Sequence, residues 1–138
     1  MAQTIFPYLL YEDAAAMIEW LTRAFGFTEK LRYADDDGVV NHAELSIGGG
    51  SIMLGAPGGE YRSPRNGGGW PAQIQVYVED VDEHYERARA AGAEVRQELA
   101  DMPYGDRRYD VYDPEGHLWM FSTHVRDVPA EDWGATAA

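Results

Sequence analysis

Cysteine is absent from this chain of 138 residues. Its absence excludes a disulfide framework, a thiolate metal site and a cysteine nucleophile. No apolar run approaches the length that crosses a bilayer, and Met1-Ala2-Gln3 shows no basic region followed by an apolar stretch. We therefore expect a soluble, cytoplasmic protein without a signal peptide and without a membrane partner.

Basic residues are scarce, because 11 Lys and Arg stand against 24 Asp and Glu, for a formal net charge of −13. Nucleic acid needs a basic surface, so we expect no nucleic-acid partner. Neutral or cationic small molecules suit this field better, although surface acid also serves solubility alone. The length suffices for one domain with a substantial core.

The sequence is similar to itself at an offset of 67 positions. The stretch LLYEDAAAMIEWLTRAFGF begins at Leu9, and VYVEDVDEHYERARAAGAEV begins at Val76. Each stretch has the pattern of an apolar strand, Glu-Asp, an amphipathic helix and a closing glycine. The same offset relates Met53 to Met120. These matches indicate two copies of one structural unit.

Each predicted helix begins at an aspartate whose carboxylate can accept from free backbone amides, Asp13 in the first unit and Asp80 in the second. Helical apolar spacing ends at Gly26 and Gly92, and His84 is expected on the helix surface. Three strands follow each helix, over about 28–33, 39–47, 51–54, 94–99, 107–112 and 118–123. Each unit is therefore βαβββ, and the predicted fold class is α+β.

The predicted organisation is a single domain over residues 1–128. Unit one covers about 4–56, a Gly- and Pro-rich linker or lid covers 57–71, unit two covers about 72–125, and 129–138 form a tail. Near the end, DPEGHLWMF joins a turn sequence to four consecutive apolar residues. A strand with one solvent-exposed face alternates apolar with polar residues. This strand does not alternate, so both of its faces are expected to be covered.

Tandem βαβββ units, Glu-Asp before each helix and DPEGHLWMF near the end resemble the vicinal oxygen chelate superfamily, which includes glyoxalase I, bleomycin-resistance proteins and extradiol dioxygenases. The resemblance spans about residues 4–125. FPYLLYEDAAAMIEWLTRAFGF and YGDRRYDVYDPEGHLWMFSTHV are most similar to its PhnB-like branch. It implies curved mixed sheets around a cavity, helices outside, and a homodimer. Trp119 and Phe121 would then face the helices, and Leu118 and Met120 the cavity.

Metal-using members of this superfamily place one ligand on the first and one on the last strand of each unit. Carried over by position, these sites fall on Phe6, Met53, Gln73 and Met120. Zinc, nickel, iron and manganese need imidazole or carboxylate donors, whereas a phenyl ring offers none, a thioether suits copper(I) and an amide oxygen is weak. We therefore expect no metal and no other cofactor, which argues against glyoxalase I and dioxygenase chemistry.

The alternation of side chains along each strand predicts which of them line the cavity in place of metal ligands. Trp70, at the end of the linker, and Tyr104 are expected to close over a ligand. Arg108 is either an anion clamp or the partner of Asp106 or Asp110. The expected ligand-binding residues are Phe6, Tyr8, Met53, Trp70, Gln73, Gln75, Tyr77, Tyr104, Arg108, Leu118 and Met120. Such a mixture suits a small organic ligand, although the same residues can fill a sheet face or a dimer seam.

His42 and Glu44 lie two residues apart on a strand, hence on one face. They are the candidate catalytic residues, because a neutral imidazole beside a carboxylate can act as a general base; an ordinary salt bridge is the alternative. The predicted function is metal-free binding of an aromatic or cationic natural product. The alternatives are a lyase or dioxygenase-like enzyme of this superfamily, using a metal or His42 and Glu44, and a protein whose sheet faces serve assembly.

Overall fold

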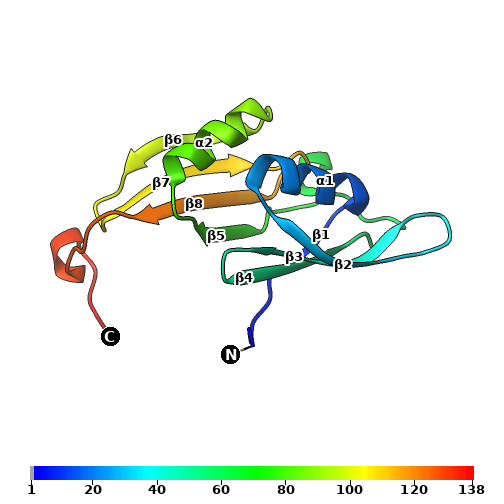
Figure 1. Cartoon of the computed structure of the whole chain (residues 1–138), viewed down its shortest axis with the longest axis horizontal. Helices are drawn as coiled ribbons and strands as arrows, with labels where there is room; N and C mark the ends of the chain where they lie inside the picture. The colour runs from blue at the N-terminus through cyan, green and yellow to red at the C-terminus, as the bar shows by residue number, and fades with distance from the viewer. Residues whose placement is uncertain (1) are drawn as a thin grey trace.

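The structure of the protein is a computed structural model that describes residues 2–138; Met1, where the predicted domain begins, lies outside them. It confirms the α+β class and two tandem βαβββ units (Figure 1). The elements of unit one are β1 (Tyr8–Leu10), α1 (Ala14–Phe25), β2 (Thr28–Ala34), β3 (Val40–Ile47) and β4 (Gly50–Gly55). Those of unit two are β5 (Gln73–Tyr77), α2 (Val81–Ala90), β6 (Glu94–Asp101), β7 (Asp106–Tyr112) and β8 (Leu118–His124).

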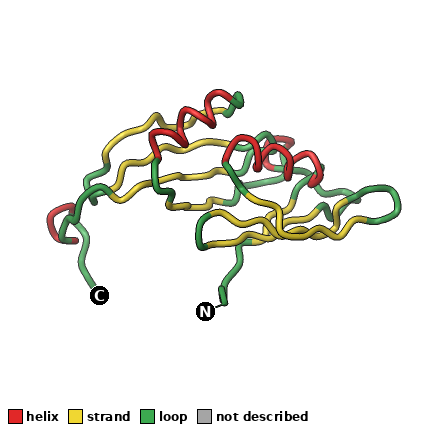
Figure 2. Tube along the Cα trace, in the orientation of Figure 1, coloured by secondary structure: helices red, strands yellow, loops and turns green. Residues whose placement is uncertain are grey.

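Each unit forms one mixed sheet, ordered β1-β4-β3-β2 in the first and β5-β8-β7-β6 in the second. The first strand of each unit pairs in parallel with the last strand, and the other pairs are antiparallel. Tyr8 lies opposite Met53, and Gln75 lies opposite Met120, so the 67-residue repeat extends to the backbone register. Figure 2 shows the α-helices α1 and α2 on the same side of the two sheets. Two short 3₁₀ helices, Pro64–Asn66 and Ala130–Trp133, lie outside the two units.

Both helices begin as their sequences predict. Asp13 accepts a hydrogen bond from the backbone N–H of Ala16 at 3.0 Å, and Asp80 accepts one from Glu83 at 3.1 Å. Helix α1 ends at Gly26, whose φ of 82° is the left-handed conformation that glycine adopts without strain. No helix within residues 2–138 is long and apolar enough to cross a membrane.

One residue of α2 contradicts its prediction, because His84 is buried rather than exposed. Its Nδ1 lies 2.5 Å from the Tyr109 hydroxyl, and its Nε2 donates to the Phe25 carbonyl oxygen at 2.7 Å. Phe25 ends α1, so His84 fixes one helix of unit two against the end of the helix of unit one. Burial lowers the pKa of His84 below its ordinary value.

Aromatic side chains from both units build the core between helices and sheets. Trp119 and Phe121 are fully buried and contact the ring of Phe25, with ring centroids 5.6 and 4.7 Å away. They therefore face the helices, as the resemblance implied. On the opposite face of β8, Leu118 is buried and Met120 is half-buried.

The DPEG turn, residues 113–116, joins the two units. The fully buried carboxylate of Asp113 accepts from the Tyr11 hydroxyl at 2.7 Å and from Trp119 Nε1 at 3.0 Å. It also accepts from the backbone N–H groups of Glu115 and His117. Four donors thus compensate one buried charge, and one of them, Tyr11, belongs to unit one.

Hydrogen bonds fix the linker against both units. Glu12 accepts hydrogen bonds from the backbone and hydroxyl of Ser63 and from the Asn66 amide, and Ser63 is fully buried. Arg65 Nε donates to the Pro114 carbonyl oxygen at 2.8 Å. At Gly116, with φ of 97°, a Cβ would meet the Arg65 backbone nitrogen at 2.8 Å, so only glycine lets turn and linker approach this closely.

Candidate functional site

The candidate site consists of the two sheet faces that point away from the helices. Side chains alternate along each strand, so neighbours in register share a face. Across the first sheet one such row contains Tyr8, Met53, Glu44 and Leu31. The equivalent row of the second sheet contains Gln75, Met120, Asp110 and Gln97. A methionine therefore occupies the equivalent position on the last strand of each unit.

On the first sheet, Tyr8 and His42 form a pair. The Tyr8 hydroxyl lies 2.8 Å from His42 Nδ1. Gly55 lies beside this pair, since a Cβ there would clash with the Asn41 carbonyl oxygen and lie 3.4 Å from the Tyr8 hydroxyl. No hydrogen bond or salt bridge among the described residues joins His42 to Glu44, so the partner of this imidazole is a phenol rather than a carboxylate.

On the second sheet, a buried carboxylate holds two arginines. Asp110, whose side chain is 1% exposed, accepts from Arg108 Nε at 2.8 Å and Nη2 at 3.1 Å, and from Arg96 at 3.5 Å. Arg108 also donates to the Tyr104 hydroxyl at 3.1 Å and to the Met120 sulfur at 3.2 Å. The bond to Asp110 raises the pKa of Arg108 above its ordinary value. The structural pairing considered for Arg108 is present, and it uses Nε and Nη2 of the guanidinium.

The other polar side chains on this face form hydrogen bonds with side chains on other strands of the same sheet. Gln75 Nε2 donates to the Ser122 hydroxyl at 2.8 Å. The Tyr77 hydroxyl donates to Asp106 at 2.6 Å, and this bond raises the pKa of Tyr77. The other oxygen of Asp106 lies 3.0 Å from His124.

Other predicted residues are scattered. Phe6 is half-buried but precedes β1, and Gln73 is exposed at the start of β5. Trp70 is 96% exposed in the linker, so it covers none of the other site residues. Tyr104 lies in the β6–β7 loop, where its ring packs 5.6 Å from that of Trp133.

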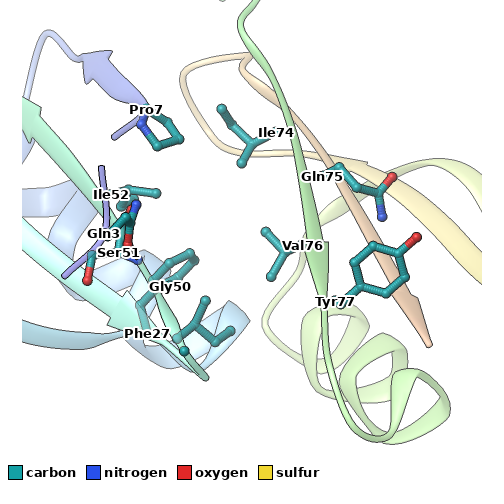
Figure 3. A pocket seen from close by; sticks show the side chains of 12 residues that line it. Gln3, Pro7, Phe27, Gly50, Ser51, Ile52, Ile74, Gln75, Val76 and Tyr77 are labelled. Atoms are coloured by element: carbon teal, nitrogen blue, oxygen red, sulfur yellow. Dashed lines mark hydrogen bonds between the residues drawn. The ribbon is translucent and has the colours of Figure 1, made fainter. Parts of the chain in front are cut away.

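A cavity of about 260 Å³ lies between the two units (Figure 3). Its wall includes Gln75 and Tyr77 but neither Met53 nor Met120, so it differs from the predicted cavity. Gln3 also lines it, and sequence reasoning missed that residue. No periodic signal marked Gln3, because it precedes the first strand.

The side chains at the positions carried over from metal-using members of the superfamily do not fit the divalent metal that those members bind. The register places Tyr8 opposite Met53 and Gln75 opposite Met120. Neither these two residues nor Phe6 and Gln73 add an imidazole or carboxylate donor to the two methionines. Within residues 2–138 no group of three His, Asp or Glu is arranged to hold a metal ion.

Comparisons with known proteins agree with this architecture. A sequence model of the Glyoxalase/Bleomycin resistance protein/Dioxygenase superfamily matches residues 4–121. An uncharacterized protein of Mycobacterium tuberculosis is 38% identical over 131 residues, which cover 91% of this chain and 77% of that protein. An uncharacterized protein of Mycobacterium bovis is equally identical, with 86% of its length covered.

Solved structures show the same fold. The crystal structure of TioX from Micromonospora sp. ML1 superimposes with a TM-score of 0.75 at 42% identity, covering 90% of this chain and 100% of TioX. The fosfomycin resistance protein FosX from Listeria monocytogenes superimposes with a TM-score of 0.65 at 19% identity, covering 96% and 98% of the two chains, which shows a shared fold alone. This chain therefore belongs to the glyoxalase/bleomycin resistance protein/dioxygenase superfamily.

Proposed function

We propose that this chain binds a neutral aromatic or cationic organic molecule on the open faces of its sheets, without a metal and without turnover. One observation carries the proposal: the central row of each open face presents a thioether beside a phenol or an amide. Methionine adapts to irregular ligands and makes favourable contacts with aromatic rings, which suits tolerant recognition.

Exposed aromatic side chains support the proposal. Tyr8 is 50% exposed and Tyr77 is 61% exposed, and Tyr33 pairs in register with His42 on the same face as Tyr8. Tyrosine offers a flat apolar surface with a hydroxyl that forms hydrogen bonds, and its ring can stack on an aromatic or cationic ligand. The formal net charge of −13 favours cationic over anionic ligands.

A homodimer is part of the proposal. The open faces of the two units lie side by side within one chain, and the apolar side chains of Tyr8, Leu10 and Leu31 are at least 40% exposed there. A second copy placed against them encloses a ligand site and buries this surface. Light scattering coupled to gel filtration tests the assembly. We further place the protein in the PhnB-like branch and in the cytoplasm; cell fractionation tests the location.

A thermal-shift screen tests binding. The protein, purified without a metal-affinity tag, is screened against cationic glycopeptides, aromatic metabolites and divalent metal salts. A ligand at one hundred times its Kd stabilises the fold by about 2.7 kcal/mol. We expect a shift with an organic ligand that weakens in Met53→Ala and Met120→Ala. Met102→Ala, in the β6–β7 loop, is the matched control and is expected to retain the shift.

Metal analysis of the same preparation separates the proposal from metal-dependent enzymes of this superfamily. We expect far less than one metal ion per chain. Stoichiometric zinc, nickel or iron, together with a thermal shift caused by a metal but by none of the organic ligands, contradicts the proposal.

A second candidate function, metal-free acid–base catalysis, rests on the Tyr8–His42 hydrogen bond of 2.8 Å. An imidazole that exchanges a proton with a phenol can transfer that proton to or from a bound substrate. If a ligand found in the screen is converted to product, Tyr8→Phe and His42→Gln are expected to reduce kcat at least tenfold while binding persists. Unchanged turnover in both variants rejects this role.

A further inference from the structure

The cavity lies between the strand β5 of the second sheet and the β3–β4 turn of the first sheet. Among residues 2–138, β5 pairs only with β8, so it is an edge strand of its sheet. Val78 N donates to the Ser122 carbonyl oxygen at 2.9 Å, so the even-numbered backbone groups point toward β8. By alternation, the backbone N–H and C=O groups of Gln73, Gln75 and Tyr77 point toward the other edge. Such an edge can pair with a further strand.

The opposite side of the cavity shows how such groups are satisfied. Gln3 Oε1 accepts from the backbone N–H of Ser51 at 2.7 Å, and Gln3 Nε2 donates to the carbonyl oxygen of Ser51 at 2.8 Å. One carboxamide thus makes both hydrogen bonds that the backbone of a neighbouring strand would make. The cavity therefore already holds an amide group against the backbone of β4.

Apolar side chains line the cavity between β5 and the β3–β4 turn. Figure 3 shows Phe27 and Ile52 on the side of unit one, and Ile74 and Val76 on the side of unit two. Their surfaces favour an apolar side chain between the units. Gly50 leaves the Ser51 side of the wall uncrowded, since only the Ile47 carbonyl oxygen lies within 4 Å of its Cβ position.

We propose that this cavity binds an extended peptide segment, neutral or cationic, that pairs with the outer edge of β5. Only an extended chain of secondary amides supplies N–H and C=O groups at the spacing of Gln73, Gln75 and Tyr77. The net charge of −13 disfavours acidic peptides. The site goes beyond the proposed function. It shares Gln75 and Tyr77 with the proposed ligand face but needs neither Met53 nor Met120, which do not line the cavity.

The probe is the blocked peptide N-acetyl-Lys-Val-Thr-Val-Lys-amide, titrated into nitrogen-15-labelled protein and followed by NMR. We expect the amide signals of Gln75 and Tyr77 to shift and their hydrogen exchange to slow, while those of Val76, already bonded to β8, change little. The comparison probe is the same peptide with N-methyl groups on the two valine nitrogens. Each hydrogen bond lost is expected to weaken binding about fivefold.

Two variants of one residue test the edge itself. Gln75→Pro removes the outward N–H, and proline is tolerated on the solvent side of an edge strand. Gln75→Ala loses the same side chain but keeps the N–H, so it is the matched control. We expect Gln75→Pro to bind the peptide at least fivefold more weakly than Gln75→Ala, with both variants retaining a cooperative thermal transition.

Three results overturn the proposal. The first is the absence of any shift at Gln75 and Tyr77 with the unmethylated peptide. The second is equal binding of the two peptides or of the two variants. The third is slow exchange of the Gln75 and Tyr77 amides before any peptide is added, which means that these groups already have hydrogen-bond partners. The proposed function is judged separately, by the thermal shift with an organic ligand and its weakening in Met53→Ala and Met120→Ala.

Discussion

At the scale of single residues, His84 shows how burial fixes a protonation state. A carbonyl oxygen can only accept, so Nε2 carries the proton toward Phe25, and Nδ1 accepts from the Tyr109 hydroxyl. The neutral ring satisfies both contacts. A second proton would remove the acceptor and place a charge in the core.

This arrangement predicts a loss of stability in acid. Because the pKa of His84 is lowered in the folded protein, the unfolded chain takes up the proton first as the pH falls. The stabilising contribution of neutral His84 is complete above the pKa of about 6.5 that histidine has in the unfolded chain. It is lost as the pH falls from there toward the lower pKa of His84 in the folded protein. The slope is at most about 1.4 kcal/mol per pH unit for one proton.

Urea unfolding of the native protein and of His84→Gln, measured between neutral and mildly acidic pH, checks this. We expect the stability difference between the two proteins to shrink as the pH falls, because the imidazole of the native protein titrates in this range and the carboxamide that replaces it does not. Parallel stability curves for the two proteins contradict the assignment.

Gln97 offers a second prediction at this scale. Its Nε2 is buried without a hydrogen-bond partner, and among the described residues it is alone in this. A buried, unsatisfied donor costs about 1–3 kcal/mol. Gln97→Met, similar in shape, is therefore expected to raise the free energy of unfolding by about 1 kcal/mol in urea titrations. Gln73→Met, on an exposed position, is the control expected to show no gain.

At the scale of elements, the helix starts follow local chemistry. Asp13 caps α1 by accepting from Ala16 N. Asp13→Ala is expected to lower the free energy of unfolding by about 1 kcal/mol, measured by chemical denaturation. Asp36→Ala, in the exposed turn between β2 and β3, removes the same charge without removing a cap. Equal losses in both variants would indicate a charge effect instead of capping.

The sequence predicted the helices and strands better than it predicted which residues contact one another between them. Helical spacing and the repeat identified both helices, and the resemblance placed Trp119 and Phe121 against them. The same spacing also contains a signal for His84, since Val81, His84 and Ala88 follow one helical stripe and all three are buried. Histidine is polar, so the sequence alone favoured a surface position for His84. Its hydrogen-bond partners, Phe25 and Tyr109, lie in distant segments and could not be identified from the stripe.

The candidate site was harder to predict for the same reason. Strand parity placed Tyr8 and Met53 on one face, and the register confirms that they are neighbours. Parity alone could not decide whether Phe6 or Tyr8 lies beside Met53, because a parallel partner is set by the path of the whole βαβ connection. The Tyr8–His42 contact joins two strands that are not neighbours in the sheet, and no periodic signature of the sequence marks it.

At the scale of the whole molecule, Asp113 ties unit two to unit one. Burial, with the nearby Asp113 carboxylate, raises the pKa of Tyr11 well above its ordinary value, so the phenol remains a donor. Asp113→Asn replaces one acceptor oxygen by an amide that faces other donors, and it is expected to lower the free energy of unfolding by about 3 kcal/mol. Urea denaturation measures it, and Asp132→Asn in the exposed tail is the control. A loss below about 1 kcal/mol would mean that this carboxylate is not a main tie between the units.

Glu12 binds the linker, Arg65 of the linker binds Pro114, and Glu115 accepts from the backbone N–H groups of Glu12 and Asp13. These contacts form a closed circuit through three parts of the chain. Severing the backbone at the exposed Gly58–Gly59 peptide leaves every one of them intact. Two separately produced fragments that end and begin at this bond are therefore expected to associate and refold into the native structure. The gene can then be divided at this position into two complementing halves.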